Sequence, residues 1–234
     1  MAFGPIMRFV VGELRVELAP LTKESMGEFV NLEHGGGLQQ RSVTRYMGMP
    51  SAPVAEDEQD WYDKTRTAKD TLVWGIWLVT KDGDTEVRTL IGNSALVDIG
   101  KDGHTSLIHQ ATSGSMIFRK EYWGKGIASA AHKARTWYAF KQMGLHRIKS
   151  AVIQANAASR KALEHSGYTL VYTERNEQYG DGQLHHLDCL ECLNPLDFFW
   201  SQWWHGERPS KASRDARLRT LEVMDWAEKN VELA

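Results

Sequence analysis

The sequence predicts an α+β protein with one sheet and helices packed on its faces. The first observation is a run of segments rich in Val, Ile and Trp, separated by hairpin-turn signals, which is typical of antiparallel strands. The second is a set of segments with apolar residues at helical spacing that end at a glycine. A meander followed by a strand–helix–strand unit and a closing hairpin favours this mixed architecture.

The strands are predicted from alternation, β-branched content and turn residues. Residues 14–18 alternate apolar and charged side chains, and Pro20 ends that segment. Hairpin turns are predicted at residues 81–84 (Lys-Asp-Gly-Asp), at Asp102-Gly103 and at residues 180–182 (Gly-Asp-Gly). The expected strands are residues 14–18, 71–80, 87–99, 113–118, 147–153, 168–174 and 184–193.

Capping residues and glycines mark where the helices begin and end. Thr22 can cap a first helix, and three glycines at 35–37 interrupt it. Residues 38–56 carry two prolines and are expected to be irregular. The acids at 56–60 suit the positive end of a second helix, which includes Trp61. The expected helices are residues 23–34, a segment that begins at 56–60, residues 127–143 and residues 156–166.

Composition limits the class of protein. The chain has 234 residues, of which 42% are hydrophobic and 25% charged, as in ordinary soluble globular proteins. A net charge of -2 excludes a strongly basic nucleic-acid binder. The apolar stretch at residues 72–79 is far shorter than the ~20 residues that span a membrane. Two cysteines cannot form a disulfide framework, so we expect a reducing compartment, the cytosol.

The segment with the clearest chemical meaning is residues 123–129 (Trp-Gly-Lys-Gly-Ile-Ala-Ser), between a strand and a helix. Glycines allow a tight turn with no side chain in the way of a ligand. The first N–H groups of the helix that follows carry partial positive charge and can bind phosphate. Lys120 and Lys125 could add charge there. The same pattern also fits a simple helix cap, and it is neither a Walker A loop nor a complete dinucleotide fingerprint.

Two blocks of the chain carry a family resemblance. In the first, Trp123, Gly126 and Ala128 fill the places of an acetyl-CoA loop that reads Gln/Arg-x-x-Gly-x-Gly/Ala. The second reads Gly-Leu-His-Arg-Ile from residue 144, Asn-Ala-Ala-Ser from 156 and Leu-Glu-His-Ser-Gly-Tyr from 163. Together they resemble the GNAT acetyltransferase superfamily. The closest branch is the Rim-type one, the ribosomal-protein alanine N-acetyltransferases and their small-molecule relatives. The similarity is strong over residues 110–170, looser back to residue 14, and does not cover 195–234.

The resemblance implies a GNAT-like twisted, mostly antiparallel mixed sheet flanked by helices, over residues 1–194. It also implies acetyl-CoA as co-substrate, with no metal. The strands at 113–118 and 147–153 would splay apart and bond the pantetheine arm like an added strand. A backbone N–H near Ile117 or Phe118 would polarise the thioester carbonyl. The residues implied to bind the cofactor are Met116, Ile117, Phe118, Trp123, Gly124, Lys125, Gly126, Ile127, Ala128, Ser129 and Asn156.

The implied reaction is direct attack of an amine on the bound thioester, without a covalent enzyme intermediate. In many family members a Tyr seven residues after the motif Asn is the general acid, and here that position is Leu163. The expected catalytic residues are Ser159, as a substitute that stabilises the thiolate, and Asn156, which would bond pantetheine or a water; both also suit a helix cap. Relatives often carry a Glu base on the fourth strand, where this chain has Ser113. A water chain could serve as base instead, and the side-chain candidates are Asp98, His109, Glu33 and His34.

Two other features invite a functional reading. Cys189 and Cys192 lie at odd spacing in an expected strand, as do His185 and His186, so each pair points to opposite faces and no metal site is expected. Residues 195–234 form a Trp-rich, helical C-terminal extension. This tail could pack on its own core, form a homodimer contact or cover the acceptor site.

The expected function is acetyl transfer to a primary amine, either a peptide amine (N-terminal or lysine) or a small-molecule amine. The expected partners are therefore acetyl-CoA and the amine acceptor, without a membrane. One alternative is a non-catalytic acyl-CoA-binding module. A second is acetylation of an amine carried by a nucleic acid; the net charge opposes it, although Lys211, Arg214, Arg217 and Arg219 form a local basic stretch.

Overall fold

A computed structural model describes residues 2–30, 37–48, 51–100 and 108–234. The chain divides into two compact units. The first is formed by residues 1–97, 114–131 and 231–234, and the second by residues 98–113 and 132–230. β5 (Gln110–Ile117) and α3 (Ile127–Lys141) therefore each contribute residues to both units. The expected division of the chain at residue 194 stays a prediction.

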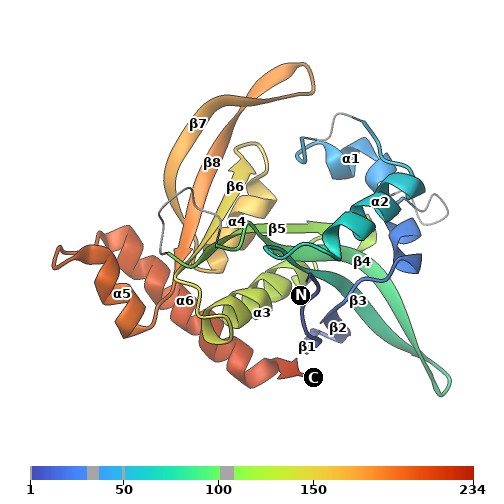
Figure 1. Ribbon diagram of the computed structural model, residues 1–234, viewed down its shortest axis with the longest axis horizontal. Coiled ribbons are helices and arrows are strands. Elements are labelled where there is room, and N and C mark those ends of the chain that lie inside the picture. Colours follow the sequence, from blue (N-terminus) through green and yellow to red (C-terminus); the bar gives the residue numbers. More distant parts are fainter. Residues whose placement is uncertain (1, 31–36, 49–50, 101–107) are drawn as a thin grey trace. The chain divides into compact units, whose positions relative to one another are not determined.

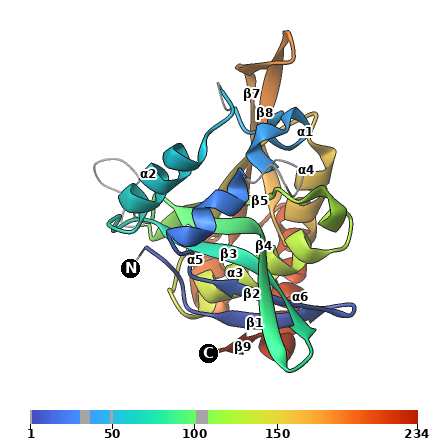
Figure 2. The ribbon, with the colours of Figure 1, turned by 90° about the vertical axis from the view of Figure 1, so that its right-hand side faces the viewer.

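The strands of the first unit form antiparallel neighbours in the order β4-β3-β2-β1-β9 (Figure 2). Their bounds are Met7–Val11 (β1), Leu14–Ala19 (β2), Leu72–Asp82 (β3), Thr85–Val97 (β4) and Glu232–Leu233 (β9). The first eight residues of β3 are all buried, as suits a strand with neighbours on both edges and side chains packed on both faces. The hairpin predicted at 81–84 is confirmed, and the strands β1 and β9 were not predicted.

Short helices cover a hydrophobic cluster in this unit. They are η1 (Glu24–Phe29), η3 (Gly37–Gln39), α1 (Arg41–Thr44) and α2 (Ala55–Thr65). A further short helix, η5 (Lys120–Tyr122), has no buried residue. The cluster contains Phe29, Leu38 and Phe118, and the partly buried Trp61 and Tyr62 of α2 pack against it. The helix predicted to begin in the acidic stretch is confirmed: Asp57 Oδ2 accepts a bond from the Val54 N–H at 2.9 Å.

The helix predicted for residues 23–34 is wrong in type. Residues 24–29 form a 3₁₀ helix, and residues 31–36 lie outside the described residues. Its buried Met26 and Phe29 are three residues apart, which matches the three-residue repeat of this helix type. Gly27 lies between them, and glycine weakens an α-helix. The stretch expected to be irregular contains α1 instead, because Val43 is drawn into the core.

The strands of the second unit follow the order β7-β8-β6-β5 (Figure 1). Their bounds are Arg147–Ile153 (β6), Thr169–Gly180 (β7) and Gln183–Leu193 (β8), with the first residues of β5. β8 is antiparallel to both β7 and β6, whereas β5 and β6 pair in parallel at residues 110–112 and 147–149. The mixed, mostly antiparallel sheet with flanking helices is thus confirmed.

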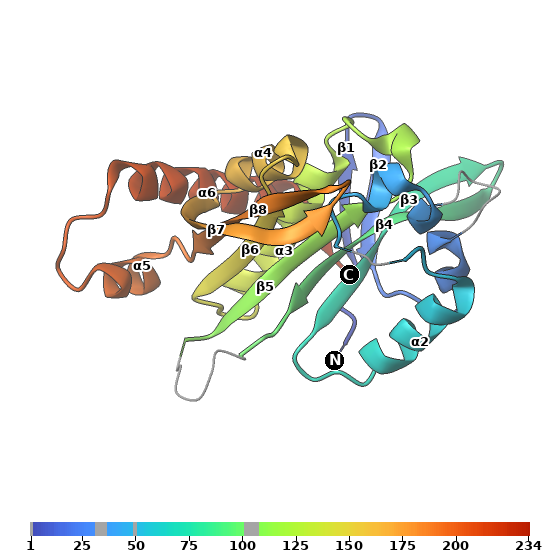
Figure 3. The same ribbon diagram turned by 90° about the horizontal axis from the view of Figure 1, so that it is seen from above.

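The tail is helical and packed within the second unit (Figure 3). It forms α5 (Asp197–Trp204) and α6 (Lys211–Asn230), and α6 lies beside α4 (Ala157–His165). Gly167 has a φ of +88°, and a side chain there would overlap the Thr220 hydroxyl of α6. The buried face of α6 consists of Ala216, Thr220, Val223, Met224 and Ala227. Of the three expectations for the tail, packing on its own chain is therefore observed.

Candidate functional site

The end of β5 lies unusually close to β4 in the first unit. A Cβ on Gly92 would overlap the carbonyl oxygen of Met116, so only glycine allows this approach. The Phe118 N–H donates to the Ile91 carbonyl oxygen at 3.0 Å. That N–H therefore already has a backbone partner, and the role expected of a backbone N–H near residue 117 or 118 stays a prediction. No local pattern marks Gly92, and the sequence analysis missed it.

The glycine loop follows directly and is tied to β5. The indole N–H of Trp123 donates to the Ile117 carbonyl oxygen at 2.8 Å, while 45% of the Trp123 surface stays exposed. Gly124 and Gly126 have φ angles of +72° and +80°, a backbone conformation that favours glycine. The Trp123 contact therefore fixes the loop against the strand that is expected to bind the thioester.

The loop opens α3 at its N-terminus. The Ala130 N–H donates to the Gly126 carbonyl oxygen at 3.0 Å, so the N–H groups of residues 127–129 precede this first helical bond. The partial positive charge at this end favours a phosphate group. Lys125 Nζ lies 5.2 Å from the ring centroid of Tyr122, which keeps a cation at the loop. The geometry of residues 124–129 therefore suits a pyrophosphate.

Asn156 and Ser159, the expected catalytic residues, belong to the second unit. Asn156 is the N-cap of α4, and its Oδ1 accepts a bond from the Ser159 N–H at 3.2 Å. The capping role expected for Asn156 is confirmed. Ser159 and Asn156 are both only partly buried, so their side chains are accessible to a ligand.

The general base expected from the sequence has few remaining candidates. Asp98 and His109 are exposed surface groups. Glu33 and His34 lie outside the described residues. Glu58 of α2, which the sequence analysis did not consider, is half-buried, and burial together with the negative charge of Asp57 raises its pKa to about 7. It lies three residues after Ala55 and four before Tyr62, which pack on the Phe118 cluster.

The sequence predicts neither a metal site nor a membrane span. Among the residues described, no group of three or more His, Cys, Asp or Glu could hold a metal ion. Cys192 is buried beside the Thr220 hydroxyl, at 3.5 Å, whereas Cys189 is only partly buried, which agrees with opposite faces. No helix in the described part of the chain has the length and apolar character needed to cross a membrane.

Comparison with known proteins identifies the family. The model of the acetyltransferase (GNAT) domain matches residues 15–169, well over half of the chain. The chain belongs to the GNAT acetyltransferase family. The match covers both the glycine loop and the Asn156–Ser159 turn, and it makes this chain an N-acetyltransferase.

Solved GNAT structures share the fold at low identity. The spermidine N-acetyltransferase of Vibrio cholerae, solved with CoA and spermine, is 18% identical, has a TM-score of 0.61, and the match covers 76% of this chain and 95% of that one. RimJ of Mycobacterium smegmatis, solved with CoA-disulfide, is also 18% identical, with a TM-score of 0.63 and coverage of 99% and 96%. A GNAT acetyltransferase from Bacillus anthracis is 18% identical, with a TM-score of 0.59 and coverage of 81% and 99%. These likenesses show the fold alone.

This GNAT chain departs from the family pattern at two positions, and the structure explains what occupies each. Leu163, in the place of the usual acid Tyr, is 1% exposed and forms part of the core. Ser113, in the place of the usual Glu base, accepts a bond from the fully buried Arg135 at 2.5 Å. Burial and the Arg135 charge also hold the pKa of the neighbouring His132 well below its ordinary value. The partly buried Ser113 therefore binds a buried polar pair, Arg135 and His132, and a serine hydroxyl bonded in this way is no base.

Proposed function

We propose that this acetyltransferase transfers the acetyl group of acetyl-CoA to a primary amine by direct attack within a ternary complex. The observation that carries the proposal is the loop at residues 124–129, where two glycines of positive φ open α3 toward an anion. The amine nitrogen forms a bond to the thioester carbonyl carbon, the C–S bond breaks, and the thiolate leaves. Holding both reactants together supplies much of the rate, because the reaction becomes effectively unimolecular.

The first test is release of CoA thiol with a panel of amines. The panel contains spermidine and spermine, because one solved relative carries those names, and a peptide with a free α-amine. Acetylation of at least one primary amine, with equal amounts of thiol and acetylated product, is the expected result. Binding of acetyl-CoA without transfer to any of them would instead indicate a binding module.

Ser159 is proposed to stabilise the departing thiolate, and Asn156 to bond pantetheine or an ordered water. Ser159→Ala is expected to lower kcat about tenfold, while the Kd for acetyl-CoA changes less than about twofold, because the thiolate charge develops only during the reaction. Steady-state kinetics and calorimetry measure the two quantities. Asn156 must be left intact, since its Oδ1 caps the helix. An unchanged kcat in a folded variant would mean that Ser159 serves only the first turn of α4 and does not stabilise the thiolate.

Glu58 is proposed as the group that accepts the amine proton. A free lysine-like ammonium has a pKa near ~10, but its nitrogen becomes far more acidic as it bonds to the thioester carbonyl carbon. A base whose pKa is about 7 can then accept the proton. Glu58→Gln is expected to lower kcat about tenfold. This loss is smaller than is usual when a general base is removed, because water can accept the proton instead. The wild-type kcat should rise as pH increases through about 7, when Glu58 loses its proton, and the variant should lack that step.

The same carboxyl gives a readout that does not depend on activity. The folded protein holds the Glu58 proton up to about pH 7, whereas an unfolded Glu releases it near ~4.3. Stability therefore falls as pH rises between these values, because the folded state binds more protons than the unfolded state. The change in Tm from pH 5 to pH 8 should be more negative for the wild type than for Glu58→Gln. An identical difference in both proteins would refute the raised pKa.

Two further expectations remain proposals, the homodimer and the compartment, and a third is not favoured. A homodimer contact through the tail is supported by Phe198, which is 70% exposed, and Leu218, which is 59% exposed. The cytosol is proposed as the compartment from the cysteine content. Acetylation of a nucleic-acid amine is not favoured, because Arg217 bonds the Pro195 carbonyl oxygen at 2.9 Å and Arg219 bonds that of Glu164 at 3.0 Å. Two of the basic side chains of α6 are thus already bonded within the second unit.

A further inference from the structure

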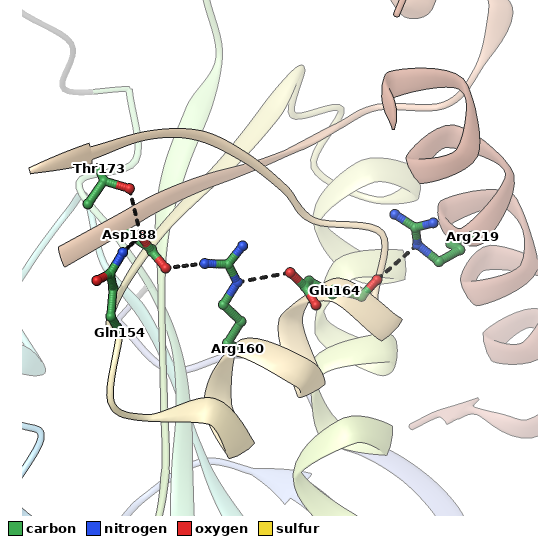
Figure 4. A network of polar contacts seen from close by, with 6 residues as sticks. All are labelled: Gln154, Arg160, Glu164, Thr173, Asp188 and Arg219. Atoms are coloured by element: carbon green, nitrogen blue, oxygen red, sulfur yellow. Dashed lines mark hydrogen bonds and ion pairs between the residues drawn. The ribbon is translucent and has the colours of Figure 1, made fainter. Parts of the chain in front are cut away.

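A carboxylate that the sequence analysis did not consider lies at the centre of a polar network in the second unit (Figure 4). Asp188 of β8 is 1% exposed. Its Oδ1 accepts bonds from the Thr173 hydroxyl at 2.7 Å and from Gln154 Nε2 at 2.9 Å. Its Oδ2 forms an ion pair with the guanidinium of Arg160. Both carboxylate oxygens are therefore used, and all partners come from within the same unit.

The two partners on the β6–α4 segment lie on either side of the site turn. Gln154 directly follows β6, and Arg160 is in the first part of α4. Between them lies the turn held by the Asn156 N–H to the Ile153 carbonyl oxygen, at 2.8 Å, and by the Ser159 N–H to Asn156 Oδ1, at 3.2 Å. One buried carboxylate thus connects both ends of the segment that carries the two proposed site residues.

Arg160 is itself held from a second direction. Its Nε donates to Glu164 Oε1 at 2.9 Å, one turn further along α4. The Glu164 carbonyl oxygen accepts a bond from Arg219 Nε of α6 at 3.0 Å. Figure 4 shows these contacts as a continuous series from Thr173 to Arg219, whose last link is to the main-chain carbonyl oxygen of Glu164. The helix that carries Ser159 is therefore fixed both to β8 and to the tail.

Asp188 stays ionised at neutral pH. Burial raises its pKa, but the bonds from Thr173 and Gln154 and the charge of Arg160 outweigh burial and hold the pKa below its usual value. Removing one partner of a buried ion pair leaves the other charge uncompensated, which is more damaging than losing an exposed pair. The network is thus sensitive to neutralisation of this one carboxylate.

We propose that Asp188 is a positioning residue for acetyl transfer, which holds the turn from Gln154 to Arg160 so that Asn156 and Ser159 keep their reactive geometry. The inference rests on the proposed function of those two residues. A displacement of about 1 Å in a reacting group can cost ~10²-fold in rate. Asp188 is 1% exposed, so it is proposed to act through these residues and not on the cofactor or the acceptor directly.

The test compares Asp188→Asn with Glu191→Gln. Glu191 is on the same strand and is also ion-paired, at 3.3 Å, but its partner Arg147 belongs to β6 and not to α4. Asp188→Asn is expected to lower kcat about tenfold with KM for acetyl-CoA changed less than about twofold, and to speed amide hydrogen exchange at Ser159 and Arg160. Glu191→Gln should change neither quantity. Gln154→Met, at an exposed position, removes one bond with little risk to folding and should give a smaller effect of the same kind.

A double variant shows whether Asp188 acts through the turn. In the Ser159→Ala background, Asp188→Asn should lower kcat by less than in the wild type, because one of the two groups that it positions is already absent. An undiminished loss there, or unchanged amide exchange at 159–160 in Asp188→Asn, would overturn the proposal. A wild-type protein that releases no CoA thiol with any amine would refute the proposed function, and amide exchange would still decide whether Asp188 holds the turn.

Discussion

Gly126→Asp is expected to weaken CoA binding about a hundredfold, which corresponds to ~2.7 kcal/mol. Gly126 has a φ of +80° and directly precedes the first turn of α3. An aspartate there would place negative charge where the helix N-terminus favours a phosphate. The new Cβ would lie 3.5 Å from Val11 Cγ1, an ordinary contact, and aspartate tolerates positive φ better than most residues. The fold should therefore survive, and calorimetry with CoA measures the loss.

The control for this variant is Gly83→Asp. Gly83 also has a positive φ, +60°, and a Cβ there would have no neighbour within 4 Å. It lies in the turn between β3 and β4 and not in the glycine loop. The same residue change at a similar backbone angle should leave the Kd for CoA unchanged. If both variants bind CoA as the wild type does, the loop does not hold the pyrophosphate.

Features set by neighbours in the sequence could be predicted. The glycine loop, the Asn156 cap and the hairpin turns at 81–84 and 180–182 depend on residues a few positions apart, and the bounds of β6 were predicted correctly. The turn predicted at Asp102-Gly103 lies outside the described residues. Helix ends at Gly144 and Gly167 are local in the same way, because both positions have positive φ. Such signals act before tertiary contacts form, so a single sequence contains them.

Features set by distant residues could not be predicted. The close approach at Gly92 depends on Met116, and the Asp188 network joins residues that are 15 to 34 positions apart. The pKa of Glu58 is raised by burial, which a position in an acidic helix does not reveal. The 3₁₀ helix at 24–29 was mistaken for an α-helix because packing of Met26 and Phe29 decides its type. The candidates for the base predicted from the sequence therefore did not include Glu58.

Met224→Asp is expected to destabilise the protein by about 4 kcal/mol, since it removes a buried apolar side chain and buries a charge. Met224 is 6% exposed on the face of α6 that also contains Thr220 and Ala227. Because the Thr220 hydroxyl fills the space above Gly167, movement of α6 would also open the core beside β7 and β8. Denaturant unfolding measures the loss as a lower midpoint.

The matched control is Leu218→Asp on the same helix. Leu218 is 59% exposed, so the same kind of change should alter stability by no more than about 0.5 kcal/mol. Equal stability of both variants and the wild type would mean that α6 does not pack on the core in solution. The molecular mass from scattering tests whether the tail also forms a homodimer. If exposed residues of the tail form the dimer contact, Leu218→Asp should halve that mass. Met224→Asp should instead unfold the chain. A monomeric wild type would leave packing within one chain as the role of the tail.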